Sequence, residues 1–592
     1  MPASLARILD ARGATRVRIA PDERWLCYVS DVTGSPQLWR VPVAGGAATR
    51  LTFDRDRVGA HRISPDGRRI AYAADTGGDE KWQLWVMDAD GANPRRLSER
   101  DDRIHHLRAW TPDGREILVL ANIRDARYFD LWMYPANGEA PRMLYRHDGT
   151  AFDATPLPDG SIVVTANRGR NDRHDLVLVA PDGASRRLTP DEPAALHRVV
   201  AAVPGGLIVE SDRDRDFIGL ATIGLDGTLR RLVTPEHDVE EAHASGRLAA
   251  YALNVDGLSE IHLREGERDE TVAGLPAGAL ATDLVGDSLA LEGETIAVAW
   301  ARYDAPSTIY VGRRGERMRE LVRPLMDGIS ADGLPQARLV EWPTFDGRRI
   351  PGFLLTPRGA QHASRPTIIE VHGGPEGQAR PLWNPRTVAF VASGFSVLQP
   401  NVRGSTGYGR AYQALDDVRL RMDSVRDLDA AAAWLADSGV APRDKIGVMG
   451  QSYGGYLALA AVAFFPERGW AAAVDVYGIA NFLTFFEHTD AWRRPLRAAE
   501  YGDPEKDRDF LVSISPITKL DAIRAPIMFI HGANDPRVPI GETEQIVAAL
   551  RAKGRDVEYL RYEDEGHSLA KAKNRADAYP KVLAFFRRHM GP

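Results

Sequence analysis

The pentapeptide Gly450–Gly454, with the sequence Gly-Gln-Ser-Tyr-Gly, places a serine hydroxyl between two glycines. Ser452 follows the apolar stretch 445–449, which has the length of a strand, and precedes the small apolar residues 455–463, which suit a buried helix. A sharp strand-to-helix turn of this kind holds a nucleophilic serine clear of a sheet, and the flanking glycines leave room for neighbouring backbone. The pattern therefore predicts that Ser452 attacks an acyl carbon.

A serine nucleophile needs a base and an acid that orients the base, and both have candidates downstream. Asp535 and His567 each come just after a predicted strand, on the loop that follows it. In a parallel sheet such loops meet at one edge, and the order Ser, Asp, His is that of an α/β-hydrolase. We expect His567 to accept the Ser452 proton and Asp535 to orient the imidazole. His531 precedes Asp535 in the chain, and we interpret it as structural.

Acyl transfer also needs donors for the oxyanion. The residues His372–Pro375, His-Gly-Gly-Pro, follow a predicted strand at 367–371 and match a loop whose backbone N–H groups face the nucleophile. We predict one donor at the N–H of Tyr453 and a second at the N–H of Gly374 or Gly373.

Several sequence blocks occur in one order with suitable gaps. They are His372–Pro375, 401–409 (Asn-Val-Arg-Gly-Ser-Thr-Gly-Tyr-Gly), 450–456, 531–539 and Glu565-Gly-His567. On these blocks the C-terminal part resembles the peptidase domain of the prolyl oligopeptidase family, nearest its acylaminoacyl-peptidase branch. The resemblance implies a serine peptidase that acts on short peptides, with a β-propeller capping the site.

Repeats in the first 330 residues provide a separate indication of a β-propeller. A turn that opens a strand recurs as Ser64–Gly67 and Thr111–Gly114. A Leu-Trp dipeptide within a predicted strand recurs at Leu38-Trp39, Leu84-Trp85 and Leu131-Trp132. A period of about 45 residues with several short strands per unit is typical of propeller blades, and seven units predict seven blades.

We therefore predict the fold class β + α/β, in which an N-terminal seven-bladed β-propeller precedes a C-terminal α/β-hydrolase domain. The propeller is expected over residues 1–330 and the hydrolase domain over residues 331–592. Residues 1–14 can form a short helix that packs on the hydrolase domain.

Composition narrows the function classes. The 592 residues include 75 Lys and Arg against 82 Asp and Glu, a net charge of −7, which gives no support for nucleic-acid or anionic-membrane binding. No stretch reaches about 18 apolar residues, and no secretory signal or metal-binding and cofactor-binding motif is present, so we predict no membrane span, metal or cofactor. The single cysteine, Cys27, fits a cytoplasmic protein. A homo-oligomer stays open.

Two features bear on substrate choice. Arg403 follows a predicted strand end near the site, and it is either structural or meets a substrate carbonyl or carboxylate. In the family, the segment after the sixth strand lines the pocket for the residue before the scissile bond. The aromatic candidates here are Phe482, Phe485, Phe486, Trp492 and Tyr501. Such a pocket would favour an apolar or aromatic side chain.

The expected substrate is a short peptide or a small acyl compound. Acylaminoacyl-peptidase activity, the release of a blocked N-terminal residue, is the leading hypothesis, with a looser oligopeptidase or aminopeptidase beside it. A dipeptidyl-peptidase would need paired carboxylates for a free amino group, and Glu240–Glu241 or Glu210 with Asp212 are candidates. An esterase or amidase for a small molecule, or a binding module with a vestigial hydrolase, are further alternatives.

Overall fold

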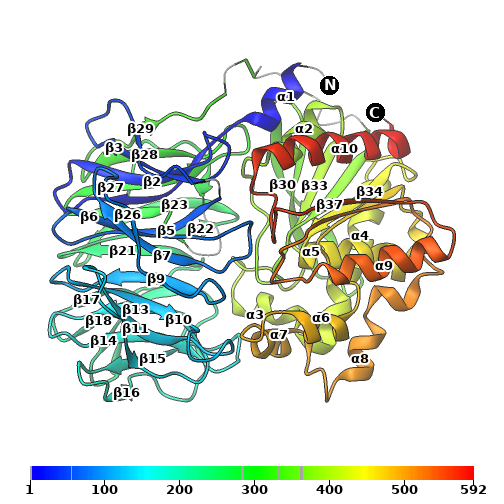
Figure 1. The fold of residues 1–592 in the computed structure, drawn as a ribbon. Coiled ribbons are helices and arrows are strands. Elements are labelled where there is room, and N and C mark those ends of the chain that lie inside the picture. The colour runs from blue at the N-terminus through cyan, green and yellow to red at the C-terminus, as the bar shows by residue number, and fades with distance from the viewer. Residues whose placement is uncertain are drawn as a thin grey trace.

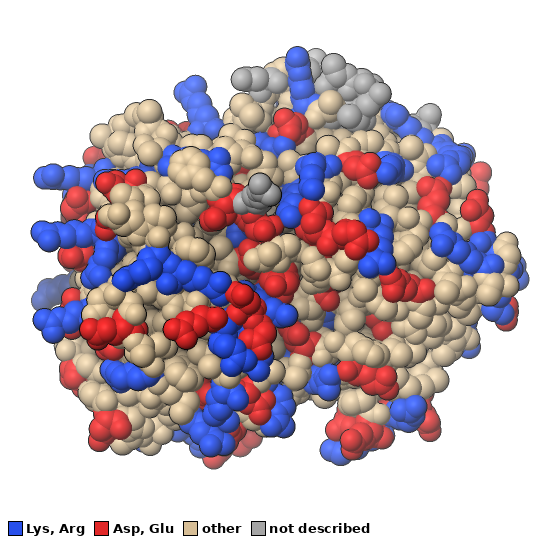
Figure 2. Space-filling view, in the orientation of Figure 1, with Lys and Arg blue, Asp and Glu red and all other residues tan. Residues whose placement is uncertain are grey.

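The computed structural model describes residues 3–54, 56–281, 286–326, 328–329, 334–359 and 364–591. The chain forms a β-propeller from its first 29 strands and an α/β domain from the remainder, and the two lie side by side (Figure 1). Lys and Arg are intermixed with Asp and Glu over the face that Figure 2 shows.

The propeller has seven sheets, each made of strands that follow one another in the chain and pair antiparallel. The first four are β1 (Ala14–Ile19), β2 (Trp25–Ser30), β3 (Gln37–Pro42) and β4 (Thr49–Arg50); β5 (Val58–Ile63), β6 (Arg69–Ala74), β7 (Gln83–Asp88) and β8 (Arg95–Arg96); β9 (His105–Trp110), β10 (Glu116–Ala121), β11 (Asp130–Pro135) and β12 (Arg142–Tyr145); and β13 (Thr150–Pro156), β14 (Ile162–Asn167), β15 (Asp175–Val179) and β16 (Ser185–Arg187).

The last three sheets are β17 (His197–Val203), β18 (Gly206–Ser211), β19 (Gly219–Gly224) and β20 (Leu229–Val233); β21 (Val239–Ser245), β22 (Leu248–Val255), β23 (Leu258–Glu265) and β24 (Arg268–Thr271); and β25 (Ala279–Leu280), β26 (Leu289–Glu292), β27 (Thr295–Ala301), β28 (Thr308–Arg313) and β29 (Arg319–Val322). The ring closes where β1 packs on the last sheet, because Ala14 and Val17 share a core with Ala290 and Val311.

The repeated turn joins the first two strands of a blade, as Ser64–Gly67 does between β5 and β6. In the second blade the Asp66 carboxylate accepts hydrogen bonds from the Ser64 hydroxyl at 2.6 Å and from the Arg68 N–H at 3.0 Å. Gly67 then takes φ +69°, a left-handed conformation that glycine adopts without a steric penalty. The turn aims the chain back along the blade, so each unit buries its apolar faces against its neighbours.

The α/β domain is built on one sheet with strand order β30-β31-β33-β32-β34-β35-β36-β37, antiparallel up to β33 and parallel from there on. Its strands are β30 (Pro335–Pro343), β31 (Arg349–Pro357), β32 (Thr367–Val371), β33 (Ser396–Pro400), β34 (Ile446–Gln451), β35 (Ala472–Val476), β36 (Ile527–Gly532) and β37 (Val557–Tyr562). The strands β32 to β36 are almost wholly buried, as expected for parallel strands covered on both faces.

Helices cover both faces of this sheet. They are α1 (Ala3–Asp10), α2 (Pro385–Ala392), α3 (Arg410–Gln413), η2 (Ala414–Asp416), η3 (Val418–Leu420), α4 (Arg421–Asp437), α5 (Tyr453–Phe464), η4 (Pro466–Arg468), α6 (Phe482–His488), α7 (Arg494–Tyr501), α8 (Arg508–Ser513), η5 (Pro516–Lys519), α9 (Gly541–Ala552) and α10 (Ala572–Met590). One core joins α4, α5 and α9 to the sheet, and a second joins α2 and α10 to its other face.

The N-terminal helix α1 crosses from the propeller to the α/β domain and lies beside α2 and α10 (Figure 1). Ile8 and Leu9 are buried in the core that those two helices share. The predicted fold class, a seven-bladed propeller followed by an α/β-hydrolase domain, is confirmed. The last propeller strand ends at Val322 and β30 begins at Pro335, while residues 327 and 330–333 of the predicted linker lie outside the described residues. Within the described ranges, no helix has the length and apolar character needed to cross a bilayer.

Candidate active site

The serine turn has the strained geometry that the pentapeptide predicts. Ser452 lies between β34 and α5 with φ 58° and ψ −123°, a backbone conformation that costs about 1–3 kcal/mol for a residue with a side chain. A Cβ on Gly450 would lie 2.1 Å from the Gly454 oxygen, and one on Gly454 would lie 2.3 Å from the Val371 oxygen. Only glycine therefore fits on either side of Ser452, whose own N–H donates to Val476 at 2.9 Å.

Three side chains from three loops join in one hydrogen-bonded chain. The Ser452 hydroxyl lies 2.8 Å from Nε2 of His567, and Nδ1 of His567 lies 2.6 Å from Oδ2 of Asp535. The other carboxylate oxygen of Asp535 accepts the N–H groups of Arg537 at 2.9 Å and Val538 at 3.0 Å. These bonds fix the carboxylate, so Nδ1 carries the proton and Nε2 is left to accept the serine proton.

The protonation states of His567 and Asp535 are set by burial and by the interaction of the two side chains with each other. Burial lowers the pKa of His567 below the ordinary histidine value, although Asp535 works in the opposite direction. Burial on its own would raise the pKa of Asp535, but the charge of His567 and the hydrogen bonds from His531 and His567 hold it below the usual range. At neutral pH the site therefore holds an ionised Asp535 and a neutral His567, which is the state in which an imidazole can act as a base.

The second histidine of this region supports the aspartate loop. His531 is fully buried at the end of β36. Its Nε2 donates to the Val538 carbonyl at 2.9 Å and lies 3.4 Å from Oδ2 of Asp535, and its Nδ1 lies 2.8 Å from the Thr543 hydroxyl. Both ring nitrogens are thus engaged away from Ser452, which agrees with the structural interpretation of His531.

Backbone N–H groups of two segments lie next to the serine. Tyr453 is the first residue of α5, so its N–H has no acceptor within the helix. The loop after β32 passes so close that a Cβ on Gly373 would lie 3.2 Å from the Ser452 Cβ. Nε2 of His372 lies 2.8 Å from the Ser405 hydroxyl and its Nδ1 lies 2.9 Å from the Gly373 oxygen, so the loop is pinned at its first residues. Gly374 completes the tight turn with φ +142°.

Ser452 and His567 open into a cavity of about 560 Å³ between the two halves of the molecule. The propeller contributes side chains of its fourth blade, namely Phe152, Asn167, Arg170, Asn171 and His174. The α/β domain contributes Gly373, Gly374, Glu376, Tyr477, Trp492, Arg493, Arg497 and Arg537, among others. The candidate nucleophile thus faces a space lined mainly by polar side chains, whose volume limits the size of what can reach it.

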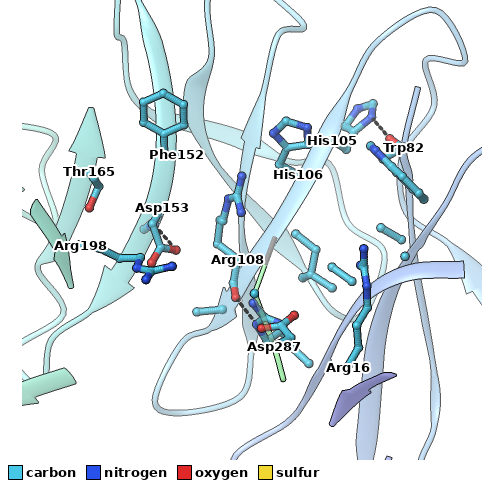
Figure 3. Close-up of a pocket in the computed structure, with 18 of the residues that line it drawn as sticks. Arg16, Trp82, His105, His106, Arg108, Phe152, Asp153, Thr165, Arg198 and Asp287 are labelled. Atoms are coloured by element: carbon cyan, nitrogen blue, oxygen red, sulfur yellow. Dashed lines mark hydrogen bonds and ion pairs between the residues drawn. The ribbon is translucent and has the colours of Figure 1, made fainter. Parts of the chain in front are cut away.

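A larger cavity of about 910 Å³ runs through the centre of the propeller and reaches His567. Its wall carries charged side chains of both signs, including Arg108, Asp153, Arg198 and Asp287 (Figure 3). His105 and His106 lie at another part of this wall, beside Trp82 (Figure 3). Burial lowers the pKa of both histidines, so they are neutral in the folded protein.

The predicted aromatic residues do not form one pocket wall. Phe482, Phe485, Phe486 and Tyr501 are buried in the core beneath α5, and the rings of Phe482 and Tyr501 are 5.1 Å apart. Only Trp492 among the five lines the cavity, where its ring meets that of Phe129 edge-on at 5.3 Å. The helix α6 turns its aromatic face toward α5 and α7, where the Phe482 ring lies 5.0 Å from that of Tyr456, and the cavity is lined mainly by polar side chains.

The structure also keeps Arg403 away from the cavity. Its guanidinium is buried and bonds to Asp427 at 2.9 and 3.0 Å and to Asp346 at 3.3 Å, with the ring of Phe345 beneath it at 4.7 Å. Of its two expected roles, these contacts fit the structural one.

The acidic candidates of the propeller have partners of their own. Glu240 pairs with Arg380 at 2.5 Å, and Glu210 accepts from Arg198 at 2.6 Å. Glu241 accepts the backbone N–H groups of Ser288 and Leu289 at 3.1 Å, and Asp212 accepts that of Leu196 at 2.7 Å. None of these four acids lines the described cavity in front of Ser452.

One contribution to the site has no signal in the sequence. Glu80, on the loop after β6, forms ion pairs with Arg537 at 2.7 Å and Arg493 at 2.8 Å. On the same loop the Gly77 carbonyl accepts from Asn534 at 3.0 Å, and a Cβ on Gly78 would lie 2.5 Å from the Gly566 nitrogen. The propeller therefore packs directly on the loops that carry Asp535 and His567.

Known proteins match both halves of the chain. Residues 383–592 match the Prolyl oligopeptidase family and residues 6–155 match the TolB beta propeller domain. Dipeptidyl aminopeptidase BIII of Pseudoxanthomonas mexicana is 27% identical over 595 aligned residues, covering 94% of this chain and 84% of that protein. Acylamino-acid-releasing enzyme 2 of Oryza sativa subsp. japonica is 27% identical, but the match covers only 41% of this chain and 33% of that protein.

The overall architecture has been seen in solved structures. A puromycin hydrolase superposes with a TM-score of 0.88 at 20% identity, over 100% of this chain and 96% of that one. A Pyrococcus horikoshii acylaminoacyl peptidase superposes with a TM-score of 0.74 at 18% identity, over 98% and 96%. The family match to residues 383–592 and the peptidase relatives identify the chain as a serine peptidase whose C-terminal domain is of the prolyl oligopeptidase family, and the superpositions show the same fold, with a seven-bladed propeller ahead of that domain.

Proposed function

We propose that Ser452, His567 and Asp535 are the catalytic residues of this peptidase. The observation that carries the proposal is the position of His567, which reaches the serine hydroxyl at 2.8 Å and the buried carboxylate at 2.6 Å. Ser452 Oγ attacks the scissile carbonyl while Nε2 of His567 takes its proton. The resulting oxyanion receives hydrogen bonds from the N–H of Tyr453 and that of Gly373 or Gly374.

The remaining steps return the site to its starting state. His567 donates its proton to the departing amine, which leaves an ester between the acyl group and Ser452. A water molecule then attacks this ester, with His567 again as the base, and the acid product leaves. Asp535 stays ionised throughout and stabilises the charged imidazolium in each half of the reaction.

We propose that the substrates are short peptides. The cavity between propeller and peptidase domain is about 560 Å³, which holds a few residues and excludes a folded protein. Release of a blocked N-terminal residue is the leading candidate, because the propeller acids that could clamp a free amino group are engaged elsewhere. The similarity to a dipeptidyl aminopeptidase keeps release of free dipeptides as the second candidate.

The test is cleavage of a peptide library, half of it N-acetylated, with Ser452→Ala as the control and mass spectrometry as the readout. Release of single acetylated residues supports the first candidate, and release of free dipeptides supports the second. Hydrolysis of p-nitrophenyl acetate without cleavage of any peptide would overturn both in favour of a small-molecule esterase or amidase. Cleavage by Ser452→Ala equal to wild type would overturn the proposed nucleophile.

Two coarser assignments accompany this proposal. We place the domain boundary between β29 and β30, where the last propeller strand ends and the first strand of the large sheet begins. We also propose a cytoplasmic location, because Cys27 is the only cysteine and it is buried in the first blade.

A further inference from the structure

The cavity in front of Ser452 is lined by a single acidic side chain among the described residues, Glu376. Glu376 comes directly after the His372–Pro375 loop, so it is carried by the same turn that places Gly373 beside the serine. Its side chain is half-buried and, within the described part of the chain, it forms no ion pair with Lys or Arg. A carboxylate in an enclosed site without a cationic partner is costly, so its persistence beside the nucleophile needs an explanation.

Glu376 meets a second carboxyl group. Its carboxyl group is hydrogen-bonded to that of Glu500 on α7. Glu500 is already committed, since one oxygen pairs with Arg421 and the other accepts the Asn171 amide at 3.0 Å. Arg421 also pairs with Asp416, so the charge of this buried guanidinium is already shared by two carboxylates.

The titration behaviour of the acids agrees with this imbalance. Burial, followed by the charge of Glu500, raises the pKa of Glu376 to about 8. Burial likewise raises the pKa of Asp416 to about 7 and that of Asp417 to about 6, in both cases with a contribution from Glu500. Without a bound cation, Glu376 therefore stays largely protonated at neutral pH.

The arginines that line the same cavity do not neutralise Glu376. Arg493 and Arg537 pair with Glu80, and Arg170 pairs with Asp172 at 2.8 Å. Arg497 acts on Glu376 only through its field, because its guanidinium donates to the Gly374 carbonyl at 3.4 Å and lies 5.9 Å from the centre of the Tyr501 ring.

We infer that Glu376, backed by Glu500, is a specificity subsite that pairs with a positively charged group of the substrate next to the scissile bond. The inference rests on the proposed function of Ser452 and adds the substrate class to it. The group is an ammonium or a guanidinium, supplied by a free α-amino group or by a Lys or Arg side chain. On binding, Glu376 releases its proton to solvent, and its carboxylate forms an ion pair with the cation in the cavity.

The subsite differs from the carboxylate pairs expected from the sequence. Those acids lie in the propeller, whereas Glu376 and Glu500 belong to the peptidase domain. The subsite also replaces the expectation of an aromatic-lined pocket, because four of the five predicted aromatic side chains are packed in the core.

The test uses four aminomethylcoumarin amides in which the two sources of charge vary independently: those of lysine, norleucine, acetyl-lysine and acetyl-norleucine. For wild type, Glu376→Gln and Glu376→Ala, kcat/KM is measured for each. We expect wild type to prefer at least one cationic compound over acetyl-norleucine, and both variants to reduce that preference by about 10- to 100-fold, the range for a charge-assisted hydrogen bond. If the variants lose the preference for norleucine over acetyl-norleucine, the subsite binds the α-amino group. If they lose the preference for acetyl-lysine over acetyl-norleucine, it binds the side chain.

The ratio of kcat/KM values for two compounds, measured on one enzyme preparation, does not depend on the fraction of folded enzyme. A folding defect therefore does not imitate a loss of substrate preference. Glu505→Gln is the matched control, because it removes the same charge from an exposed turn of the same domain and should leave the ratios unchanged. Equal losses for all four compounds, or unchanged ratios in both variants, would overturn the subsite.

A second readout separates the subsite from the peptidase proposal. Lysinamide should inhibit hydrolysis of p-nitrophenyl acetate by wild type, and Glu376→Gln should raise its inhibition constant by at least about tenfold. An unchanged constant overturns the subsite even if no peptide is cleaved. Absence of ester hydrolysis by wild type overturns the role of Ser452 instead.

Discussion

Glu80 of the propeller forms an ion pair of 2.7 Å with Arg537 of the peptidase domain. Arg537 follows Asp535 by two residues in the chain. The Glu80 carboxylate also pairs with Arg493, and burial would raise its pKa, but Arg537 and Arg493 lower it to about 2. The propeller is therefore joined electrostatically to the loop that carries the proposed triad acid, so closure of the two halves and order of the loop are linked.

Removing the Glu80 carboxylate should weaken both the closure of the two domains and the order of the Asp535 loop. In Glu80→Gln two guanidiniums lose a partly buried partner, and breaking a buried pair in this way typically costs about 3–5 kcal/mol. We expect a lower midpoint of thermal inactivation and a kcat reduced by about tenfold or more, the effect of about 1.4 kcal/mol on a barrier.

A double-mutant cycle with Arg537→Met checks the prediction. The effects of Glu80→Gln and Arg537→Met on kcat should be far from additive, because both changes remove one interaction. Additive effects would show that the pair does not couple the propeller to the Asp535 loop.

The pH dependence of kcat/KM follows from the environment of His567. Only the neutral imidazole accepts the serine proton, so activity is lost as pH falls through the pKa of His567. Burial lowers that pKa from its ordinary value of about 6.5. We therefore expect the acidic limb to have its midpoint below about 6.5, measured on an uncharged ester so that Glu376 does not contribute. A midpoint above 7 would contradict His567 as the base.

The glycine next to the nucleophile offers a test of the oxyanion donors. A Cβ in Gly373→Ala would lie 2.8 Å from the Gln451 oxygen and 3.2 Å from the Ser452 Cβ, so the loop must move away from the serine. Loss of one such donor costs about 10²–10³ in kcat, with little effect on KM. Gly541→Ala is the control, because no atom lies within 4 Å of its added Cβ and its backbone is not left-handed. Wild-type kcat in Gly373→Ala would exclude this loop as a donor.

The sequence predicted those features that depend on local chemistry. The turn at Ser452 is marked by glycine at positions 450 and 454, and the spacing of the blades is a repeat that sequence alone displays. Asp535 and His567 could be paired because parallel strands bring their following loops to one edge. Their catalytic roles remain predictions, to be tested as above.

Other features could not be predicted because they depend on how distant segments dock. A run of aromatic residues such as 482–486 fits a cavity wall or a core equally well, and only the packing of α6 decides between them. Glu80 meets Arg537 across more than 450 residues of chain, and nothing near Glu80 in the sequence marks it. Glu376 adjoins a recognisable motif, but its unpaired state becomes visible only when Glu500 and Arg421 are in place.

The two expected roles of Arg403 can be separated by experiment. In Arg403→Met the buried Asp427 loses its partner, and removing one member of a buried pair costs about 3–5 kcal/mol. The midpoint of thermal inactivation should fall clearly, whereas KM for a neutral ester should stay near that of wild type, because Arg403 does not line the cavity. Arg349→Met is the control: its pair with Glu341 at 2.8 Å is largely exposed, and such pairs contribute at most about 1 kcal/mol. A raised KM with an unchanged midpoint would instead give Arg403 a role in substrate binding, which would require its guanidinium to leave Asp427 during turnover.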